Sequence, residues 1–443
     1  MSNLVSGFPS HAKRLPEDVC VQLPHGLLLG ATNASVKLTI SKWSSMACLK
    51  AGQIGALAED YVEGTLQLDG AMRDVMGAVT RLLPGNPVAS DTGWWTGLLR
   101  RAKSVAAHTP HKDAAQVQFH YDVSDAFYAL WLDPQRVYSC AYYRDLTDTE
   151  ITLQTAQEAK LDHICRKLML KPGERFLDIG CGWGALLLWA AEHYGVQATG
   201  ITLSKNQNVR VQQLIAQKGL SHRVNVQLRD YRDLQPGPDL LPFDKISSVG
   251  MFEHVGHANM TPYFAKIMSL LVPGGLVMTH GITAGGLDNR QLGAGMGDFI
   301  EKYIFPGGEL LHVSAMLEHM ARGGLELVDA ENLRPHYART LWAWTNALES
   351  RLDEARRVLS ADGGPQAAEK TLRAYRLYLA GSAMSFEQGW LSLHQLLATR
   401  PLADGSRPSY PFTRDHMYGH PLGRTHPGES WLSPGDGVHH ESS

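Results

Sequence analysis

The sequence predicts an α/β protein: a doubly wound, mainly parallel sheet preceded by a smaller α+β domain. Between about residues 114 and 400, short segments of β-forming residues alternate with helical patterns, which is typical of βα units. One such segment, residues 175–179, leads into a turn with glycines at positions 180, 182 and 184. Residues 1–105 instead show short strand patterns broken by turns. We therefore expect domains over 1–105 and 106–400, then a Pro-, Gly- and His-rich tail over 401–443 that is partly disordered.

The composition excludes several classes of protein. The chain has 443 residues, of which 44% are hydrophobic and 19% charged, and this fits a globular protein with a sizeable core. A formal net charge of −3 gives no electrostatic reason to bind nucleic acid. The five cysteines are odd in number and lack CxxC or zinc-ligand spacing, so we expect free thiols in a reducing cytoplasm. The sequence has no secretory signal and no apolar run of about 20 residues, so any work on lipid is expected at a membrane surface.

The individual elements follow from local patterns. In the N-terminal domain we expect strands within residues 19–29 and 36–43, a helix over 49–58 and a strand-like piece at 60–64. The basic residues Arg100, Arg101 and Lys103 are interpreted as part of a solvated linker, with a membrane contact as the alternative. In the larger domain, strands are predicted over 175–179, 197–203, 224–228, 243–249 and 275–280. Helices are predicted over 206–218, 262–271, 341–359 and 367–397, and a glycine-rich lid over 284–298.

The turn after the first of these strands is the strongest motif in the chain. Its sequence is Phe176-Leu-Asp-Ile-Gly-Cys-Gly-Trp-Gly184, and glycines there let the backbone approach a ligand without a Cβ in the way. A dinucleotide site is the first alternative, because G-x-G-x-x-G also follows a strand. Here the spacing is G-x-G-x-G with Asp178 two residues ahead of it, and the next strand ends in Thr202-Leu203 rather than in an acid for a ribose. Both features favour the S-adenosylmethionine (SAM) methyltransferase pattern over NAD.

Polar residues also follow the later strands, whose carboxyl ends meet at one edge of a parallel sheet. Asp230, after the third strand, has the chemistry to accept a hydrogen bond from an adenine amino group. Glu253 and His280 come from the ends of the fourth and fifth strands, so we expect them to converge as a pair that handles a proton or positions an anion. The alternative is that each is a buried polar group that orients a loop. Glu253-His-Val-Gly-His257 has the order E-H-x-x-H and no third ligand, so we predict no metal site.

Cys140 lies ahead of the glycine turn, in the aromatic segment Tyr138-Ser-Cys-Ala-Tyr-Tyr143. A thiol admits a nucleophilic role, but the sequence shows no activating partner beside it. We favour a backbone or packing role for this cysteine.

Taken in order along the chain, these motifs resemble one family. They are His120-Tyr-Asp-Val-Ser-Asp125, Asp133-Pro134, Tyr138-Ser-Cys-Ala-Tyr142, Leu177-Asp-Ile-Gly-Cys-Gly-Trp-Gly184, Gly200-Ile-Thr-Leu-Ser204 with Gln207, Phe252-Glu-His-Val-Gly256, Tyr303-Ile-Phe-Pro-Gly307 and His336-Tyr-Ala-Arg-Thr-Leu341. The set is similar to that of the cyclopropane-fatty-acyl-phospholipid synthases and the mycolic acid cyclopropane synthases. It covers nearly the whole chain, including an N-terminal domain that the mycolic acid enzymes lack. The resemblance implies a SAM-dependent methyltransferase with a Rossmann-like sheet over 106–400.

The resemblance also implies a reaction. SAM donates a methyl cation to a cis double bond of an acyl chain, and a bound bicarbonate removes a proton from the new methyl group so that the ring closes. In such enzymes bicarbonate is held by backbone N–H groups that match Cys140 and Ile282 and by side chains that match Glu253, His280 and Tyr337. Aromatic side chains are expected around the cation, namely Tyr142, Phe299, Tyr303, Trp342 and Trp344. Ser382 stands where some family members have a cysteine, which suggests that this cysteine is not essential.

The SAM-binding positions carry over residue by residue. They match Tyr121, Tyr138, Ser139, Gly180, Gly182, Thr202, Leu203, Gln207, Asp230, Tyr231 and Val249, of which Asp230 and Tyr231 depart most from the family pattern.

The resemblance further implies a partner, a place and an assembly. The partner is a phospholipid bilayer with unsaturated acyl chains, met from the cytoplasm at the inner face of the cell membrane. The N-terminal domain is expected to engage the bilayer and to support a homodimer. Three alternatives remain open: a related lipid methyltransferase that gives a methylene or methyl-branched chain without ring closure, a small-molecule methyltransferase, and a lipid-binding protein with a vestigial SAM fold.

Overall fold

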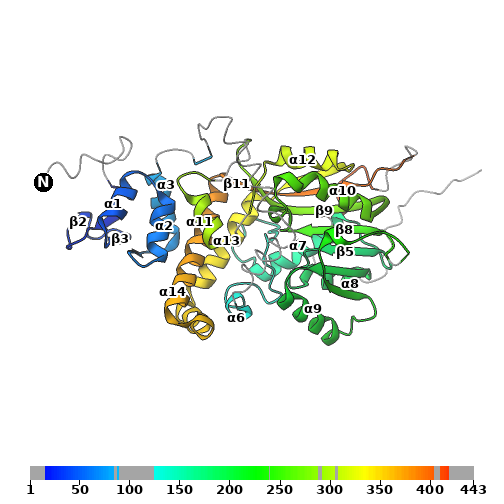
Figure 1. The fold of residues 1–443 in the computed structure, drawn as a ribbon, viewed down its shortest axis with the longest axis horizontal. Coiled ribbons are helices and arrows are strands. Elements are labelled where there is room, and N and C mark those ends of the chain that lie inside the picture. The colour runs from blue at the N-terminus through cyan, green and yellow to red at the C-terminus, as the bar shows by residue number, and fades with distance from the viewer. Residues whose placement is uncertain are drawn as a thin grey trace, which may run out of the picture.

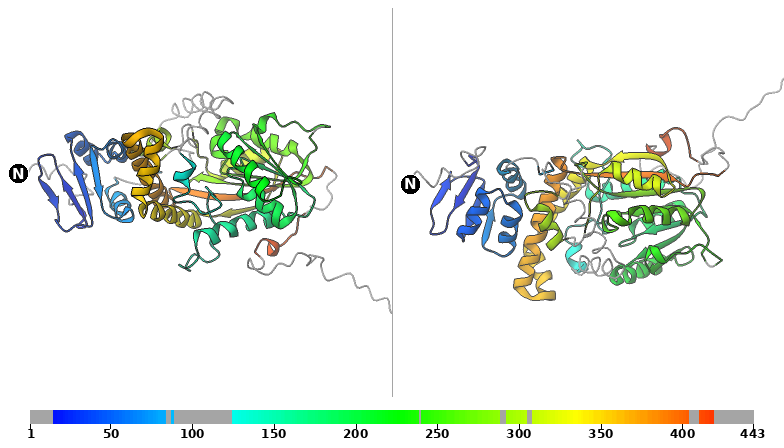
Figure 2. Two further views of the ribbon diagram at one scale, coloured as in Figure 1. Left: turned by 90° about the horizontal axis from the view of Figure 1, so that it is seen from below. Right: turned by 45° about the horizontal axis from the view of Figure 1, so that its top comes forward.

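The structure is a computed structural model that describes residues 15–83, 87–88, 124–238, 240–287, 292–304, 308–403 and 410–418. The predicted domain boundary at 105/106, the basic residues at 100–103 and the tail beyond Tyr418 lie outside these residues. The described part divides into a small N-terminal unit and a larger unit, with α13 (Arg334–Glu349) and α14 (Leu352–Glu387) standing between them (Figure 1; Figure 2).

The N-terminal unit is α+β, as predicted. Its sheet has the strand order β2-β1-β3-β4, in which β1 and β3 are parallel and the other two pairings are antiparallel. The strands are β1 (Val19–Gln22), β2 (Leu28–Gly30), β3 (Val36–Ile40) and β4 (Leu66–Asp69), and the helices are α1 (Trp43–Lys50), α2 (Ile54–Val62) and α3 (Met72–Leu82). The predicted strand-like piece at 60–64 is wrong, because these residues form the last part of α2 and the turn that follows it. The predicted helix over 49–58 is two helices, broken at Gly52, whose φ of 66° is left-handed.

The larger unit holds a seven-stranded sheet, and the prediction of a doubly wound, mainly parallel sheet is confirmed. The order is β10-β11-β9-β8-β5-β6-β7, and the chain reverses direction across the sheet between β5 and β8. The five predicted strands are all present, as β5 (Arg175–Ile179), β6 (Gln197–Thr202), β7 (Val224–Leu228), β8 (Phe243–Val249) and β9 (Leu271–Ala284). Ligands of such sheets bind at the carboxyl ends of the strands beside this reversal point.

Two strands at the other edge were not predicted. They are β10 (Glu326–Asn332) and β11 (Leu391–Thr399), and β11 runs antiparallel to both of its neighbours. The predicted helix over 367–397 is therefore wrong at its end, since α14 stops at Glu387. The apolar run of β11 pairs with the buried β9, and this tertiary contact decides its conformation. The predicted helix over 341–359 is divided between α13 and α14.

Helices cover both faces of this sheet. One face packs on α7 (Leu153–Lys167), α8 (Ala185–Tyr194) and α9 (Lys205–Gln217), and the other on α10 (Met260–Leu270) and α12 (Val313–Arg322). The short helices are α6 (Asp125–Tyr128), α11 (Met296–Tyr303), α15 (Asp415–Tyr418), η1 (Tyr231–Asp233), η2 (Phe252–His254) and η3 (His257–Asn259). Part of the predicted tail is folded, because Met417 of α15 is buried and its backbone oxygen lies 3.2 Å from His163 Nδ1 of α7.

Candidate active site

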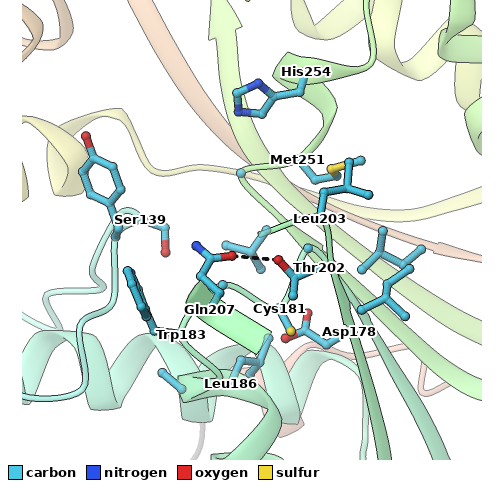
Figure 3. Close-up of a pocket in the computed structure, with 18 of the residues that line it drawn as sticks. Ser139, Asp178, Cys181, Trp183, Leu186, Thr202, Leu203, Gln207, Met251 and His254 are labelled. Atoms are coloured by element: carbon cyan, nitrogen blue, oxygen red, sulfur yellow. Dashed lines mark hydrogen bonds between the residues drawn. The ribbon is translucent and has the colours of Figure 1, made fainter. Parts of the chain in front are cut away.

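A first cavity, here named the glycine-loop cavity, opens at the carboxyl ends of β5, β6, β7 and β8 (Figure 3). Tyr121 lies outside the described residues. The other ten residues predicted to bind SAM all line this cavity: Tyr138, Ser139, Gly180, Gly182, Thr202, Leu203, Gln207, Asp230, Tyr231 and Val249.

The glycine turn needs its glycines for geometry. Gly180, Gly182 and Gly184 have φ values of 75°, 53° and 85°, in the left-handed region that other residues seldom adopt. A Cβ on Gly184 would also lie 2.9 Å from a methyl carbon of Val211 on α9. The turn is fixed to the next strand, because the N–H groups of Gly180 and Cys181 both donate to the carbonyl of Ile201 at 3.0 Å.

The end of β6 is fixed to the start of α9 by side chains. The Thr202 hydroxyl donates to Gln207 Oε1 at 2.8 Å, and both residues are buried (Figure 3). Ser204 caps α9 by accepting from the N–H of Gln207 at 3.3 Å. This segment therefore presents a neutral polar edge where a dinucleotide fold would place a carboxylate.

Asp178 is buried beneath the glycine turn. The Ser247 hydroxyl donates to its carboxylate at 2.6 Å. Burial raises the pKa of Asp178 to about 6, against the opposing effects of the Ser247 hydrogen bond and the nearby Lys160 ammonium. Asp178 is thus held by Ser247 of β8 and lines the cavity in which a sulfonium is expected.

Asp230 lines the cavity but its carboxylate is already engaged. Arg232 donates to it through Nε at 2.9 Å and through a terminal nitrogen at 2.6 Å, and its own backbone N–H donates at 2.9 Å. A hydrogen bond from an adenine amino group to Asp230 would therefore share an acceptor with this guanidinium.

A second cavity, here named the reaction cavity, adjoins the first, and Tyr138, Ser139, Gly250 and His254 line both. The five residues predicted to hold bicarbonate all line the reaction cavity: Cys140, Glu253, His280, Ile282 and Tyr337. They come from the loop around Cys140, from η2, from β9, which carries both His280 and Ile282, and from α13, so only the fold brings them together.

The two carboxylate oxygens of Glu253, on η2, differ in their surroundings: one accepts a hydrogen bond and the other does not. The N–H of Ile282 donates to Glu253 Oε1 at 2.7 Å, so this predicted anion donor is taken by the carboxylate itself. Oε2 is buried and has no hydrogen-bond partner among the described residues. Burial raises the pKa of Glu253 to about 7, although the hydrogen bond from Ile282 opposes this. The side chain can therefore take up or release a proton near neutral pH.

His280 is buried on β9, and its ring is oriented by Gln395 of β11. Nε2 of Gln395 lies 3.2 Å from His280 Nδ1. Because an amide nitrogen donates, His280 Nδ1 is the acceptor, and the proton of the neutral ring is assigned to His280 Nε2. Burial lowers the pKa of His280 well below its usual value, with smaller contributions from Lys160 and Lys167. His280 Nε2 is buried without a partner among the described residues, so a neutral ring offers one N–H to the cavity.

Cys140 is fully buried, and its thiol donates weakly to the carbonyl of Ala141 at 3.2 Å. Burial strongly raises the pKa of the Cys140 thiol, with the nearby Lys160 opposing. A protonated thiol is a poor nucleophile, which agrees with the packing or backbone role favoured from the sequence.

The predicted aromatic surroundings of a cation are wrong, because none of the five residues lines the reaction cavity. Tyr142 is instead stacked between His163 and His336 at 4.3 and 4.8 Å. Trp342 instead contacts Arg73, whose guanidinium lies 4.0 Å from the centre of its ring. The aromatic residues that do line the cavity are Tyr138, Tyr337, Tyr378 and Phe386.

Lys160 on α7 is a candidate functional residue that motif reasoning missed. It is 2% exposed, lines the glycine-loop cavity and donates to the Ser139 hydroxyl at 2.9 Å. One turn earlier, Gln157 donates to the Ser139 carbonyl at 2.8 Å. Burial lowers the pKa of Lys160 to about 8. A lysine among the apolar positions of a helix was the available sequence signal.

No cluster of three or more potential metal ligands is present within the described ranges. His254 lines both cavities, while the His257 ring lies 5.3 Å from that of His319, so the two histidines of the E-H-x-x-H segment have different surroundings.

Comparison with known proteins gives consistent matches. Residues 108–396 match the family described as mycolic acid cyclopropane synthetase. A probable fatty acid methyltransferase of Pseudomonas putida is 45% identical over 362 residues, which are 82% of this chain and 86% of that protein. Cyclopropane mycolic acid synthase 1 of Mycobacterium tuberculosis is 39% identical over 63% of this chain and 95% of its own length. The crystal structure of mycolic acid cyclopropane synthase CmaA1 with SAH and CTAB covers 66% of this chain and 99% of its own, at 36% identity and a TM-score of 0.58.

Proposed function

This chain belongs to the mycolic acid cyclopropane synthetase family, and from that premise we propose that it is a SAM-dependent lipid methyltransferase that makes cyclopropane rings. The proposed substrates are the cis double bonds of unsaturated acyl chains in phospholipid. The proposed product carries one additional carbon, bridging the two former alkene carbons.

The observation that supports this function most directly is the meeting of two unlike cavities. The glycine-loop cavity has the polar residues of a nucleoside site, including Asp178, Thr202 and Gln207. The reaction cavity has mostly apolar walls, including Leu292, Leu341 and Leu393, which suit an acyl chain. An electrophile in the first and an alkene in the second would be held together with water excluded.

The residues present fit a SAM molecule in the glycine-loop cavity. When bound, SAM supplies a methyl group as an electrophile to the weakly nucleophilic alkene. Asp178 and the backbone at Gly180 and Gly182 would hold the nucleoside and amino acid portions. Ser139, fixed by Lys160 at 2.9 Å, lies at the boundary of the two cavities and would orient the reacting end.

The residues around Glu253 fit a small hydrogen-bonding anion such as bicarbonate. When bound, bicarbonate supplies a base that can accept a proton from the new methyl group. The unpartnered Glu253 Oε2 and the Nε2–H of His280 are one acceptor and one donor for such a group. The N–H of Ile282 would become available only if Glu253 released it. With a pKa near 7, Glu253 would accept the proton passed on by the anion rather than attack the substrate itself.

Action on a bilayer, a position at the inner face of the cytoplasmic membrane, and a homodimer remain parts of the proposal. No helix within the described residues is long and apolar enough to cross a membrane. Vesicle flotation and light scattering of the purified protein would test membrane binding and the dimer separately.

Product analysis is the decisive experiment for the proposed function. The full chain is incubated with SAM, bicarbonate and vesicles of an oleoyl phospholipid, and the acyl chains are released as methyl esters. We expect chains heavier by one CH₂ whose proton NMR spectrum shows the upfield cyclopropane signals. Vesicles without SAM are the control, and the absence of any heavier chain would reject the proposal.

A related lipid methyltransferase is the second candidate, because the Pseudomonas putida relative is described as a probable fatty acid methyltransferase. A 1,2-hydride shift would move the cation to the carbon that carries the new methyl group, and loss of a proton from that methyl group would give a methylene-branched chain of the same mass as the ring. Vinylidene proton signals in place of upfield signals would identify this product. A saturated methyl branch would need an added reductant and would be heavier by two further hydrogens.

A further inference from the structure

A third cavity, here named the interdomain cavity, lies between the N-terminal unit and the larger unit. Its N-terminal walls come from β3, β4, α2 and α3, through side chains that include Leu57, Ala58, Ala78 and Val79. Its opposite wall comes from α11 and α14, through Met296, Phe299 and Leu377. The cavity measures about 140 Å³, ample room for several atoms of a ligand.

The walls of this cavity are almost wholly apolar. The few polar groups on them are largely satisfied elsewhere: the Tyr61 hydroxyl accepts from Arg376 at 2.6 Å, and the Ser385 hydroxyl donates to the Gly381 carbonyl at 2.7 Å. A site of this composition cannot hydrogen-bond a head group or hold ordered water well, but it can hold hydrocarbon.

The two units are joined closely at the rim of the cavity. The N–H of Gly55 on α2 donates to the carbonyl of Ala294 at 2.9 Å. A Cβ on Gly55 would lie 2.1 Å from the carbonyl oxygen of Gly295, so the backbones touch here as only glycine allows. Since Gly295 precedes α11, this contact fixes α11 against the N-terminal unit.

The interdomain cavity adjoins the reaction cavity. Five residues line both: Leu292, Ile300, Tyr378, Ser382 and Leu391. A chain that passed these side chains from the reaction cavity would enter a space walled by the N-terminal unit. The family match begins at residue 108, so that N-terminal wall lies outside the matched region.

We propose that the interdomain cavity holds the methyl-terminal segment of the reacting acyl chain, so that the N-terminal unit sets how much chain is accepted beyond the double bond. This inference rests on the proposed function. The methyl end is the appropriate occupant because it is apolar throughout, whereas the ester and head group need water or hydrogen-bond partners. The reaction cavity, with Glu253, His280 and Glu301 on its walls, is the more polar of the two.

The test uses substitutions that shorten the cavity from its N-terminal side. Ala78→Leu on α3 and Ala58→Leu on α2 each add three carbons to a lining position far along the chain from the proposed site. Asp74→Leu is the matched control, because it puts the same side chain at an exposed position of α3. Circular dichroism and SAM affinity establish that each variant is folded. Ala58 is only partly buried, so Ala58→Leu retains the test if Ala78→Leu fails to fold.

The substrates separate the two sides of the double bond. Palmitoleoyl and oleoyl chains share the carboxyl side and differ by two methylenes on the methyl side, whereas palmitoleoyl and cis-vaccenoyl chains differ only on the carboxyl side. For both Ala→Leu variants we expect the ratio of kcat/KM for oleoyl chains to that for palmitoleoyl chains to fall about tenfold, because the two extra methylenes no longer fit the filled apolar pocket. The palmitoleoyl-to-cis-vaccenoyl ratio should stay at its wild-type value, and Asp74→Leu should leave both ratios unchanged.

Failure of this inference and failure of the proposed function give different results. If the folded variants keep the wild-type oleoyl-to-palmitoleoyl ratio, the interdomain cavity does not hold the methyl end and the inference is overturned. A change in the palmitoleoyl-to-cis-vaccenoyl ratio alone would assign the carboxyl side to this cavity and overturn it as well. If the wild-type chain modifies none of the three substrates, the proposed function itself is at fault.

Discussion

The backbone N–H of Ile282 donates a hydrogen bond to the Glu253 carboxylate at 2.7 Å and ties the loop after β8 to β9. This bond leaves one carboxylate oxygen bound and the other buried without a partner among the described residues. The hydrogen bond thus fixes the position of Glu253, while its second carboxylate oxygen remains able to accept a proton or a hydrogen bond.

Glu253→Gln should separate positioning from proton handling. A glutamine oxygen can still accept from Ile282, but the side chain can no longer take up a proton. We expect turnover to fall by about 10²–10⁴-fold, the usual contribution of a positioned proton acceptor. Calorimetry should show SAM affinity close to that of the wild type. Wild-type turnover in this variant would contradict the role assigned to Glu253.

The pH dependence of turnover should report the same group. Burial raises the pKa of Glu253 to about 7, and only the ionised form can accept a proton, so turnover should rise with pH through about 7. The bicarbonate concentration is kept constant across the series. The rise should be absent from the residual activity of Glu253→Gln, and a rise of equal size there would assign the titration to another group.

Stability should show the opposite trend with pH. A carboxyl whose pKa is higher in the folded than in the unfolded chain binds its proton more tightly when folded, so its contribution to stability is greatest below about pH 4.5 and is lost as pH rises through 7. The free energy of unfolding of Glu253→Gln minus that of the wild type should therefore be larger at pH 8 than at pH 5, meaning that the variant gains stability relative to the wild type as pH rises. Urea unfolding at the two pH values measures this difference.

Lys160→Met should weaken SAM binding by removing the cation that fixes Ser139. The variant also leaves the Ser139 hydroxyl without this buried donor, so we expect a loss of stability of about 2 kcal/mol, as for a hydrogen bond to a charged group. Lys218→Met, at an exposed lysine paired with Glu192, is the control and should cost less than about 1 kcal/mol. Equal effects of the two substitutions on SAM affinity would refute a positioning role for Lys160.

Gly184→Ala should destabilise the glycine turn for two reasons, its φ of 85° and the 2.9 Å approach to Val211. Gly219→Ala separates these reasons, because Gly219 has a φ of 67° but no neighbour within 4 Å of an added Cβ. We expect a cost of about 1 kcal/mol at Gly219 from backbone strain and of about 3 kcal/mol at Gly184. Chemical unfolding provides the comparison, and similar costs at both positions would show that the close approach has no consequence.

Cys140→Ala should retain turnover within about threefold, since a buried protonated thiol is no nucleophile and the proposed contact uses the backbone N–H. The lost sulfur should cost about 1 kcal/mol of stability through the small cavity that it leaves. Steady-state assay at saturating SAM distinguishes this outcome from the complete loss that a nucleophilic role requires.

The glycine turn, the five parallel strands and the convergence of Glu253 with His280 could be predicted because their signals are local. A strand is short, its end is marked by a turn, and parallel strand ends meet at one edge of the sheet. The β11 strand could not be predicted in this way, because its apolar run, Leu391–Thr399, follows α14 and matches a buried helix equally well.

The sequence by itself determined the fold class, the SAM-binding motif and the residues that match the family motifs, because turns and strand ends are specified by residues that are neighbours in the sequence. Only the tertiary structure decided which aromatic side chains reach the reaction cavity, that Glu253 holds the N–H of Ile282, that Lys160 fixes Ser139, and that the N-terminal unit encloses an apolar space beside the reaction cavity. The physical reason is that these contacts join segments far apart in the chain. Their distances and burial depend on how whole elements pack, and no local pattern records that packing.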